Sequence, residues 1–246
     1  MKAMVLAAGV GRRLQPLTDT VPKPLLAVGG RPLIEIVLRR LAAAGVDRVI
    51  VNVFHHAEQM ERTLGRWSHP GLRVEISREE ELLDTGGGLK KAASFLAGRE
   101  PFFLHNADVV SGVDLGRLYA AHGRSHALAT LSVRRRPGAR QLLFNEQGFL
   151  SGWENAATGE RIVAGAAGDP AGSPFGFDGI QVVSPDIFAL LSEEGAFSLT
   201  RAYLRLAAAG ERIVAFDAGH YFWADAGTEA KLEAIRQHVA AHGWPQ

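Results

Sequence analysis

The sequence predicts an α/β protein, and three observations support this. Short apolar runs alternate with longer amphipathic runs over the first 133 residues, which is typical of βαβ units. The chain has 246 residues, 47% of them hydrophobic and 22% charged, as in a globular protein with a sizeable core. After residue 133 the alternation stops, and a glycine-containing turn joins two apolar runs. We therefore expect a Rossmann-like, doubly wound, mostly parallel sheet with an inserted β subregion.

The elements of the first part follow in a regular order. Strands are expected at "AMVLAA", "RVIVNVF", "LRVEIS", "PFFLHNAD" and "ALATLSV", and helices at "LIEIVLRRLAAAG", "HAEQMERTLG", "GGLKKAASFLAG" and "DLGRLYAAHG". Open α/β sheets bind ligands beyond the carboxyl ends of their strands. The loops of interest should therefore follow Ala7, Val53, Ser77, His105 and Val133.

The second part is less regular. The segment "QLLFNEQGFLSGW" predicts a hairpin, and residues 155–173, rich in alanine and glycine, are expected to form a surface loop. A helix from about Thr228 to His242 is expected to pack back on the sheet. No repeat or linker interrupts the chain, so we expect one domain over residues 1–246.

Charge, cysteine content and hydropathy exclude several classes of protein. Lysine and arginine number 27 and aspartate and glutamate 26, so no strong field attracts nucleic acid or an acidic membrane. The absence of cysteine excludes disulfides, thiolate zinc sites and cysteine nucleophiles. No apolar run approaches the ~18 residues of a membrane span. We expect a cytoplasmic protein with no nucleic-acid or membrane partner.

The loop after the first strand, "LAAGVGRRLQPLTDTVPKPLLAVGG", predicts an anion site. Gly9 and Gly11 form a G-x-G, but the third glycine of a dinucleotide fingerprint and the Gly-Lys pair of a Walker loop are absent. A wide loop remains, in which backbone N–H groups approach phosphate oxygens and Arg13 and Lys23 add charge. Prolines flank Lys23 and fix the direction of its ammonium group. Each cation alone would be interpreted as a solvated surface charge, whereas the whole array favours phosphate binding.

This segment is very similar to the N-terminal signature of the sugar-phosphate nucleotidylyltransferases, L-A-A-G-x-G-x-R-[LM]-x-P-L-T followed by P-K-P. The resemblance runs from Lys2 to about Ile235 and implies a glycosyltransferase-A-like fold. In such enzymes a sugar 1-phosphate attacks the α-phosphorus of a nucleoside triphosphate, and pyrophosphate leaves. The resemblance implies catalytic roles for Arg13 and Lys23. It implies nucleotide contacts from Leu6, Ala7, Ala8, Gly9 and Gly11.

Crowded phosphates require cations, and the resemblance implies Mg²⁺ held by two carboxylates at strand ends. Asp108 follows the strand "PFFLHNAD", where the family has N-G-D or a close relative. Asp225 lies in "FWADAGT", which resembles the family's W-x-D-x-G-T. A helix N-terminal cap is the alternative role for Asp225, and Thr228 is the other candidate for that cap.

Three glycines, Gly86 to Gly88, begin a helix at a folding cost of roughly 1 kcal/mol each, so we expect a flat or bulky group against them. The resemblance implies that Gly86 and Gly87 contact the nucleobase. Relatives that read the base with a glutamine have it where this chain has Leu82 and Leu83. The base is therefore left open among UTP, GTP, CTP and dTTP.

On the sugar side, "FGFDGIQVVSP" resembles the family motif F-x-G-I. It implies that Gly179 gives the sugar close access and that Asp178 accepts its hydroxyl groups, with Asn106 and Glu154 as further candidates. The E-K-P lysine of many hexose-1-phosphate enzymes is absent. The pattern points toward the smaller members, such as N-acetylmuramate-1-phosphate uridylyltransferases and mannose- or heptose-1-phosphate enzymes.

The resemblance implies a nucleotide-binding part over 1–133, a sugar-binding part over 134–225 and a C-terminal helix over 226–246. The expected partners are a nucleoside triphosphate and a sugar 1-phosphate, and the protein is either a monomer or a homodimer. Two other functions stay open. One is a cytidylyltransferase acting on a small non-sugar phosphate such as phosphocholine. The other is a catalytically silent sensor of nucleotide-sugars, against which the metal carboxylates argue.

Overall fold

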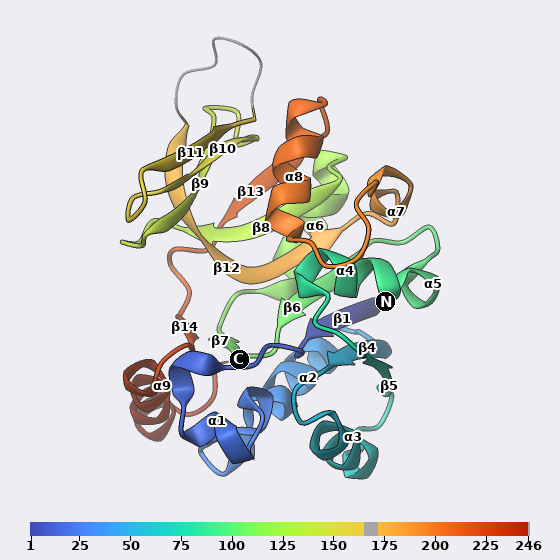
Figure 1. Ribbon diagram of the computed structural model, residues 1–246, viewed down its shortest axis with the longest axis vertical. Coiled ribbons are helices and arrows are strands. Elements are labelled where there is room, and N and C mark those ends of the chain that lie inside the picture. The colour runs from blue at the N-terminus through green and yellow to red at the C-terminus, as the bar shows by residue number, and fades with distance from the viewer. Residues whose placement is uncertain (165–171, 246) are drawn as a thin grey trace.

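The computed structural model describes residues 1–164 and 172–245 (Figure 1). Its centre is a ten-stranded sheet whose parallel half has the order β6-β1-β4-β5. These four strands are β1 (Lys2–Leu6), β4 (Arg48–Val53), β5 (Arg73–Arg78) and β6 (Phe102–Asn106). Their carboxyl ends lie at one edge of the sheet, where the predicted ligand loops begin.

One long strand joins the two halves of the sheet. β12 (Ser173–Val183) runs antiparallel to β6 and, on its other side, to β8 (Ala129–Arg134). β13 (Ile213–Asp217) pairs parallel to β8. β8 and β13 therefore point in the same direction as β6, and β12 opposes them, which gives the predicted mostly parallel sheet.

The inserted β subregion lies at one end of the molecule (Figure 1). The predicted hairpin is present as β9 (Arg140–Phe144) and β10 (Leu150–Asn155), and β9 pairs with the first residues of β12. The expected loop over residues 155–173 is wrong in part, because β11 (Glu160–Val163) pairs with β10 there. Residues 165–171 of that loop lie outside the described part of the chain.

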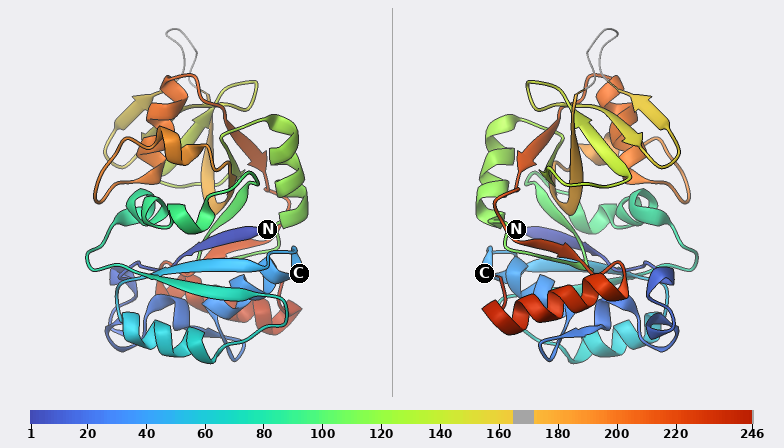
Figure 2. Two further views of the ribbon diagram at one scale, coloured as in Figure 1. Left: turned by 90° about the vertical axis from the view of Figure 1, so that its right-hand side faces the viewer. Right: turned by 90° about the vertical axis from the view of Figure 1, so that its left-hand side faces the viewer.

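Helices cover both faces of the sheet, as Figure 2 shows for α3 and α4 on opposite sides of the parallel strands. The alternation of side chains along β1 explains this, because Ala3 and Val5 enter one apolar core and Met4 enters the other. The first core includes α2 (Leu33–Ala43), α3 (Ala57–Arg66) and α6 (Leu115–Ser125). The second includes α4 (Asp84–Lys91), α5 (Ala93–Leu96), α7 (Ile187–Leu190) and α8 (Leu199–Ala208).

A third core lies outside the large sheet. The C-terminal helix α9 (Glu229–His242) contacts two small sheets, so the expectation that it packs on the central sheet is wrong. One pairs β7 (Val109–Ser111) with β14 (Trp223–Asp225), and the other pairs β2 (Ala27–Val28) with β3 (Arg31–Pro32). Three short turns precede β2, namely η1 (Arg12–Leu14), α1 (Leu17–Thr20) and η2 (Lys23–Leu25). Among the described residues, no helix has the length and apolar character needed to span a membrane.

Candidate active site

A cleft of about 460 Å³ lies at the carboxyl ends of β1, β4 and β6. It brings together most of the residues that the sequence assigned to nucleotide and phosphates. The predicted residues that line it are Leu6, Ala7, Ala8, Gly9, Gly11, Arg13, Lys23, Asn106 and Asp108. The loop after the first strand and the loop after β6 therefore form two walls of one site.

The glycines of the first loop have different structural roles. Gly11 has φ +70°, and an added Cβ there would lie 2.9 Å from Thr18 Cγ2. The Thr18 hydroxyl donates to the Gly11 carbonyl at 3.0 Å, which closes the loop on itself. A Cβ at Gly9 would meet nothing within 4 Å, so Gly9 leaves open space on the loop. Gly11 and Thr18 thus fix the conformation of the loop, and the backbone at Gly9 stays accessible.

Lys23 and Asp108 form an ion pair across the cleft. Pro22 precedes Lys23 with φ −61°, and the short turn η2 begins at the lysine. Asp108 lies in the two-residue connection between β6 and β7, and its carbonyl accepts a hydrogen bond from the Ala226 N–H at 2.9 Å. Both side chains are mostly buried, with 14% of Lys23 and 24% of Asp108 exposed. Each is therefore held in the wall of the cleft and does not extend freely into solvent.

The second predicted carboxylate, Asp225, is on a strand paired with the strand that follows Asp108. Asp225 is opposite Val109 in the β14–β7 pair. Its Oδ1 accepts from the Gly227 N–H at 2.9 Å, and its Oδ2 accepts from Lys231 Nζ at 2.5 Å. The cap of α9 is Thr228, whose hydroxyl accepts from the Lys231 N–H. Asp225 does not cap the helix, and its carboxylate belongs to the same end of the small sheet as Asp108.

Arg13 completes this cluster. An added Cβ at Gly227 would lie 2.4 Å from Asp225 Oδ1 and 3.1 Å from Arg13 Nη2. Because Gly227 has no side chain, Arg13 and the Asp225 carboxylate can both lie close to it. Arg13, Lys23, Asp108 and Gly227 line the end of the cleft that follows β6, and Asp225 lies behind Gly227, outside the cleft lining.

Gly86 and Gly87 do not line the cleft. A Cβ at Gly86 would lie 2.2 Å from the Phe197 ring, and one at Gly87 would lie 2.3 Å from the Gly195 carbonyl oxygen. The Gly86 N–H already donates to the Phe197 carbonyl at 2.9 Å. The flat group expected against these glycines is present, but it is a side chain of the protein. The nearby residues that line the cleft are Leu82, Asp84 and Thr85.

Of the sugar-side candidates, Asn106 lines the cleft, and Gly179 does not line it but packs against Asn106. Gly179 has φ +76°, and an added Cβ would be 2.7 Å from Asn106 Nδ2, so glycine is required for both conformation and space. Glu154 lies in β10 opposite Arg161 and does not line the cleft.

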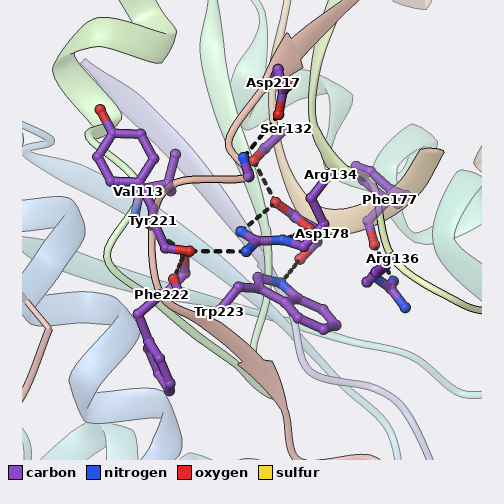
Figure 3. A network of polar contacts seen from close by, with 12 residues as sticks. Val113, Ser132, Arg134, Arg136, Phe177, Asp178, Asp217, Tyr221, Phe222 and Trp223 are labelled. Atoms are coloured by element: carbon purple, nitrogen blue, oxygen red, sulfur yellow. Dashed lines mark hydrogen bonds and ion pairs between the residues drawn. The ribbon is translucent and has the colours of Figure 1, made fainter.

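Asp178 is fully buried, and its carboxylate is already occupied (Figure 3). It accepts hydrogen bonds from Arg134 at 2.7 and 3.0 Å and from the Ser132 hydroxyl at 2.9 Å. Burial raises the pKa of the Asp178 carboxyl, and the Arg134 guanidinium acts against that rise. The expectation that Asp178 accepts sugar hydroxyls is therefore not met, because the side chain has no free face toward the cleft.

The same ion pair holds the strand that carries Asp225 (Figure 3). Arg134 donates to the Tyr221 carbonyl at 2.9 Å, and the Trp223 indole N–H donates to the Asp178 carbonyl at 2.8 Å. The guanidinium of Arg136 lies 4.4 Å from the centre of the Trp223 ring. These contacts anchor β14 to β8 and β12. Residues of the predicted sugar-binding part therefore position Asp225, one of the two candidate metal ligands.

Of three histidines near strand ends, two have ring nitrogens within hydrogen-bond distance of a backbone carbonyl. His105 is buried in β6, its Nδ1 lies 2.8 Å from the Asn106 carbonyl, and burial lowers its pKa to about 4. His55 Nε2 lies 3.2 Å from the Thr18 carbonyl. The Nε2 of His56 is buried and has no hydrogen-bond partner in the described part of the chain. None of the three lines the cleft.

Fold and cleft together define an α/β protein with a cleft beyond the carboxyl ends of its parallel strands, which is where open α/β sheets bind ligands. The family model described as "Nucleotidyl transferase" matches residues 2–141, which is more than half of the chain. The chain belongs to this family, that of the sugar-phosphate nucleotidylyltransferases.

Curated relatives agree with this assignment. An N-acetylmuramate α-1-phosphate uridylyltransferase of Caulobacter vibrioides is 36% identical over 242 residues, 94% of each chain. The corresponding protein of Neisseria meningitidis is 45% identical over 115 residues, 46% of this chain. A mannose-1-phosphate guanylyltransferase of Mycobacterium tuberculosis is 39% identical over 133 residues, 54% of this chain. The matched region spans only 49% of the Neisseria protein and 37% of the mycobacterial one.

Solved structures have the same fold. A UDP-glucose pyrophosphorylase from Acinetobacter baumanii superposes with a TM-score of 0.76 at 21% identity, covering 98% of this chain and 94% of that chain. HddC from Yersinia pseudotuberculosis, complexed with GMP-PN, superposes with a TM-score of 0.76 at 18% identity, covering 97% and 99%. At these identities the likeness concerns the fold alone.

Proposed function

We propose that this protein transfers a nucleotidyl group from a nucleoside triphosphate to a sugar 1-phosphate, giving a nucleoside diphosphate sugar and pyrophosphate. The observation that carries the proposal is the convergence, in one cleft, of the Ala7–Gly11 loop, Lys23 and Asp108. Membership of the family and the names of the relatives support it.

The residues of the cleft have distinct roles in this reaction. A phosphate oxygen of the sugar 1-phosphate forms a bond to the α-phosphorus, and the bond from that phosphorus to the bridging oxygen of the β-phosphate breaks. Backbone N–H groups around Gly9 and Gly11 would bind phosphate oxygens, and Lys23 and Arg13 would neutralise their charge. Such a site accelerates the reaction chiefly through alignment and charge stabilisation.

Asp108 and Asp225 would hold a Mg²⁺ ion. Both are hard oxygen donors. Asp108 immediately precedes β7, and Asp225 ends β14, the strand paired with β7. Each is balanced by a lysine, Lys23 or Lys231, which a cation can replace. No group of three or more acidic or histidine side chains that could hold a metal occurs within 1–164 and 172–245. Phosphate oxygens and water would therefore complete the coordination. When bound, the ion would neutralise charge on the phosphates.

The substrates remain a proposal at the level of class. The relatives point to UTP or GTP and to N-acetylmuramate or mannose 1-phosphate. Leu82, Asp84 and Thr85 are the candidates for the base side, and Asn106 is the candidate for the sugar side.

Pyrophosphate release by the purified protein with Mg²⁺ tests the proposal. The panel crosses the four common ribonucleoside triphosphates and dTTP with sugar 1-phosphates and, as a control, phosphocholine. Release with one nucleotide and one sugar phosphate is expected. Release with phosphocholine alone, or silence together with tight binding of nucleotide-sugar, would contradict it.

A further inference from the structure

A buried polar pair lies at the back of the cleft, where Asn52 is one of the lining residues and Glu79 lies behind it. Asn52, in β4, is 2% exposed, and Glu79, which follows β5, is 3% exposed. The Asn52 amide donates to Glu79 Oε1 at 2.7 Å. Neither residue belongs to the signature segments that the sequence assigned to ligands.

The pair connects two walls of the cleft. Asn52 Oδ1 accepts the Ala7 N–H at 2.7 Å, so it holds the start of the phosphate loop. Glu79 Oε2 accepts the Leu83 N–H at 3.1 Å, so it holds the segment that presents Leu82 and Asp84 to the cleft. Three hydrogen bonds thus run in a line from one wall to the other.

This arrangement is expensive for the fold. A buried carboxylate costs several kcal/mol unless it is well compensated, and here its partners are neutral N–H groups. Helix α4 also leaves space for it, because a Cβ at Gly88 would lie 2.9 Å from both Asn52 Nδ2 and Glu79 Oε1. A hydrophobic pair would fill this position at lower cost. The polar pair is therefore better explained by its hydrogen bonds to the Ala7 and Leu83 N–H groups than by a contribution to the stability of the fold.

We propose that Asn52 and Glu79 are positioning residues that fix the phosphate loop and the base-side segment at the spacing a nucleoside triphosphate requires. The inference rests on the proposed function for the identity of that ligand. Neither residue acts on the reacting atoms. The pair should set nucleotide affinity and leave affinity for the sugar phosphate unchanged.

The direction of each hydrogen bond gives a reciprocal test. Both partners of the Glu79 carboxylate, the Asn52 amide and the Leu83 N–H, are donors. In Glu79→Gln one of them would therefore face the N–H₂ group of the new amide, which cannot accept a hydrogen bond. Asn52→Asp places two carboxylates in contact. The double variant Asn52→Asp/Glu79→Gln restores the line, because the new aspartate accepts from Ala7 and from the new glutamine amide, whose oxygen accepts from Leu83. Glu75→Gln, on the exposed face of β5, is the matched control.

Calorimetry with a non-hydrolysable nucleoside triphosphate and steady-state kinetics measure the effect. Each single variant should weaken nucleotide binding and raise the nucleotide KM by about 10-fold, the scale of one lost buried hydrogen bond. The double variant should return to within about 3-fold of wild type, and the sugar-phosphate KM should not change. Unfolding midpoints measured alongside separate loss of positioning from loss of folded protein.

Two results would overturn the inference. One is equal nucleotide affinity in the wild type and both single variants. The other is a double variant at least as impaired as the worse single variant. A wild-type chain that binds the nucleotide but releases no pyrophosphate would instead refute the proposed reaction, and the binding measurements would still decide the role of the pair.

Discussion

Three adjacent glycines in α4 contact three different neighbours. Gly86 lies under the Phe197 ring, Gly87 under the Gly195 carbonyl, and Gly88 beside the Asn52–Glu79 pair. The sequence indicated correctly that a run of glycines at a helix start needs an external reason. The family resemblance implied a nucleobase contact for Gly86 and Gly87, whereas their contacts with Phe197 and Gly195, more than 100 residues away, leave no local signal in the sequence.

Replacing Gly86 by alanine should therefore destabilise the fold. The added methyl group would overlap the Phe197 ring, and overpacking of this kind costs about 1–3 kcal/mol. Gly123→Ala in α6 is the matched control, because nothing lies within 4 Å of its added Cβ. That variant should gain about 0.4–1 kcal/mol. Urea unfolding of both variants checks this, and equal stability of the two would refute the packing explanation.

Several site residues were accessible to prediction from the sequence, and others were not. Gly11, Lys23 and Asp108 stand in an unusual local pattern, and all three line the cleft. Asn52 could not be predicted as a site residue, because a single asparagine in the apolar run "RVIVNVF" matches no recognisable motif. For Asp178 the sequence motif indicated a sugar contact, but in the structure its carboxylate is paired with Arg134 of another strand.

At the scale of elements, the buried Arg134–Asp178 pair joins β8, β12 and β14. Arg134 contributes from β8 and Asp178 from β12. Arg134 also donates to the Tyr221 carbonyl, and the Asp178 carbonyl accepts from the Trp223 indole N–H. The pair is thus a tie between the sugar-side strands and the strand that presents Asp225.

Breaking that tie should cost far more than breaking a surface pair. Asp178→Ala leaves a buried guanidinium without its counter-charge, which costs about 3–5 kcal/mol of unfolding free energy. Glu160→Ala removes the half-exposed pair with Arg201 and should cost less than about 1 kcal/mol. Guanidinium unfolding curves provide the comparison. Similar losses in the two variants would mean that the buried pair is not a tie.

The parallel half of the sheet was predictable element by element, because its strands and helices alternate with distinct periods. The role of β12 was not. Its 11 residues pair with β6 and β8 along one part and with β9 along another, and none of these partners is set by the sequence of β12 itself. The docking of α9 away from the large sheet has the same origin, because one of the two small sheets that it contacts, β7–β14, forms only when distant segments meet.

At the scale of the whole molecule, stability should fall in mild acid. Burial lowers the pKa of His105 and of His122 to about 4, from an ordinary value near 6.5. The unfolded chain therefore binds more protons between pH 6.5 and 4, and the free energy of unfolding decreases as pH falls through that window. Each histidine contributes up to about 1.4 kcal/mol per pH unit. The raised pKa of Asp178 acts in the opposite direction.

Urea unfolding at pH 7 and pH 5 measures this dependence. His122→Gln should give a visibly shallower slope than wild type, because one of the two buried neutral rings is gone. A slope that is identical in wild type and variant would show that His122 does not carry the effect.

The proposed function depends most on one cleft and on the Asp108 carboxylate in its wall. The direct test is the rate of pyrophosphate release at saturating Mg²⁺, nucleotide and sugar phosphate for wild type, Asp108→Ala and Asp186→Ala. Asp186 is exposed and lies outside the cleft lining, so its variant should keep the wild-type rate. Asp108→Ala should be slower by on the order of 10²-fold or more, the scale seen when a main electrostatic group is removed. A near-normal rate for Asp108→Ala would contradict the assignment of this cleft as the active site.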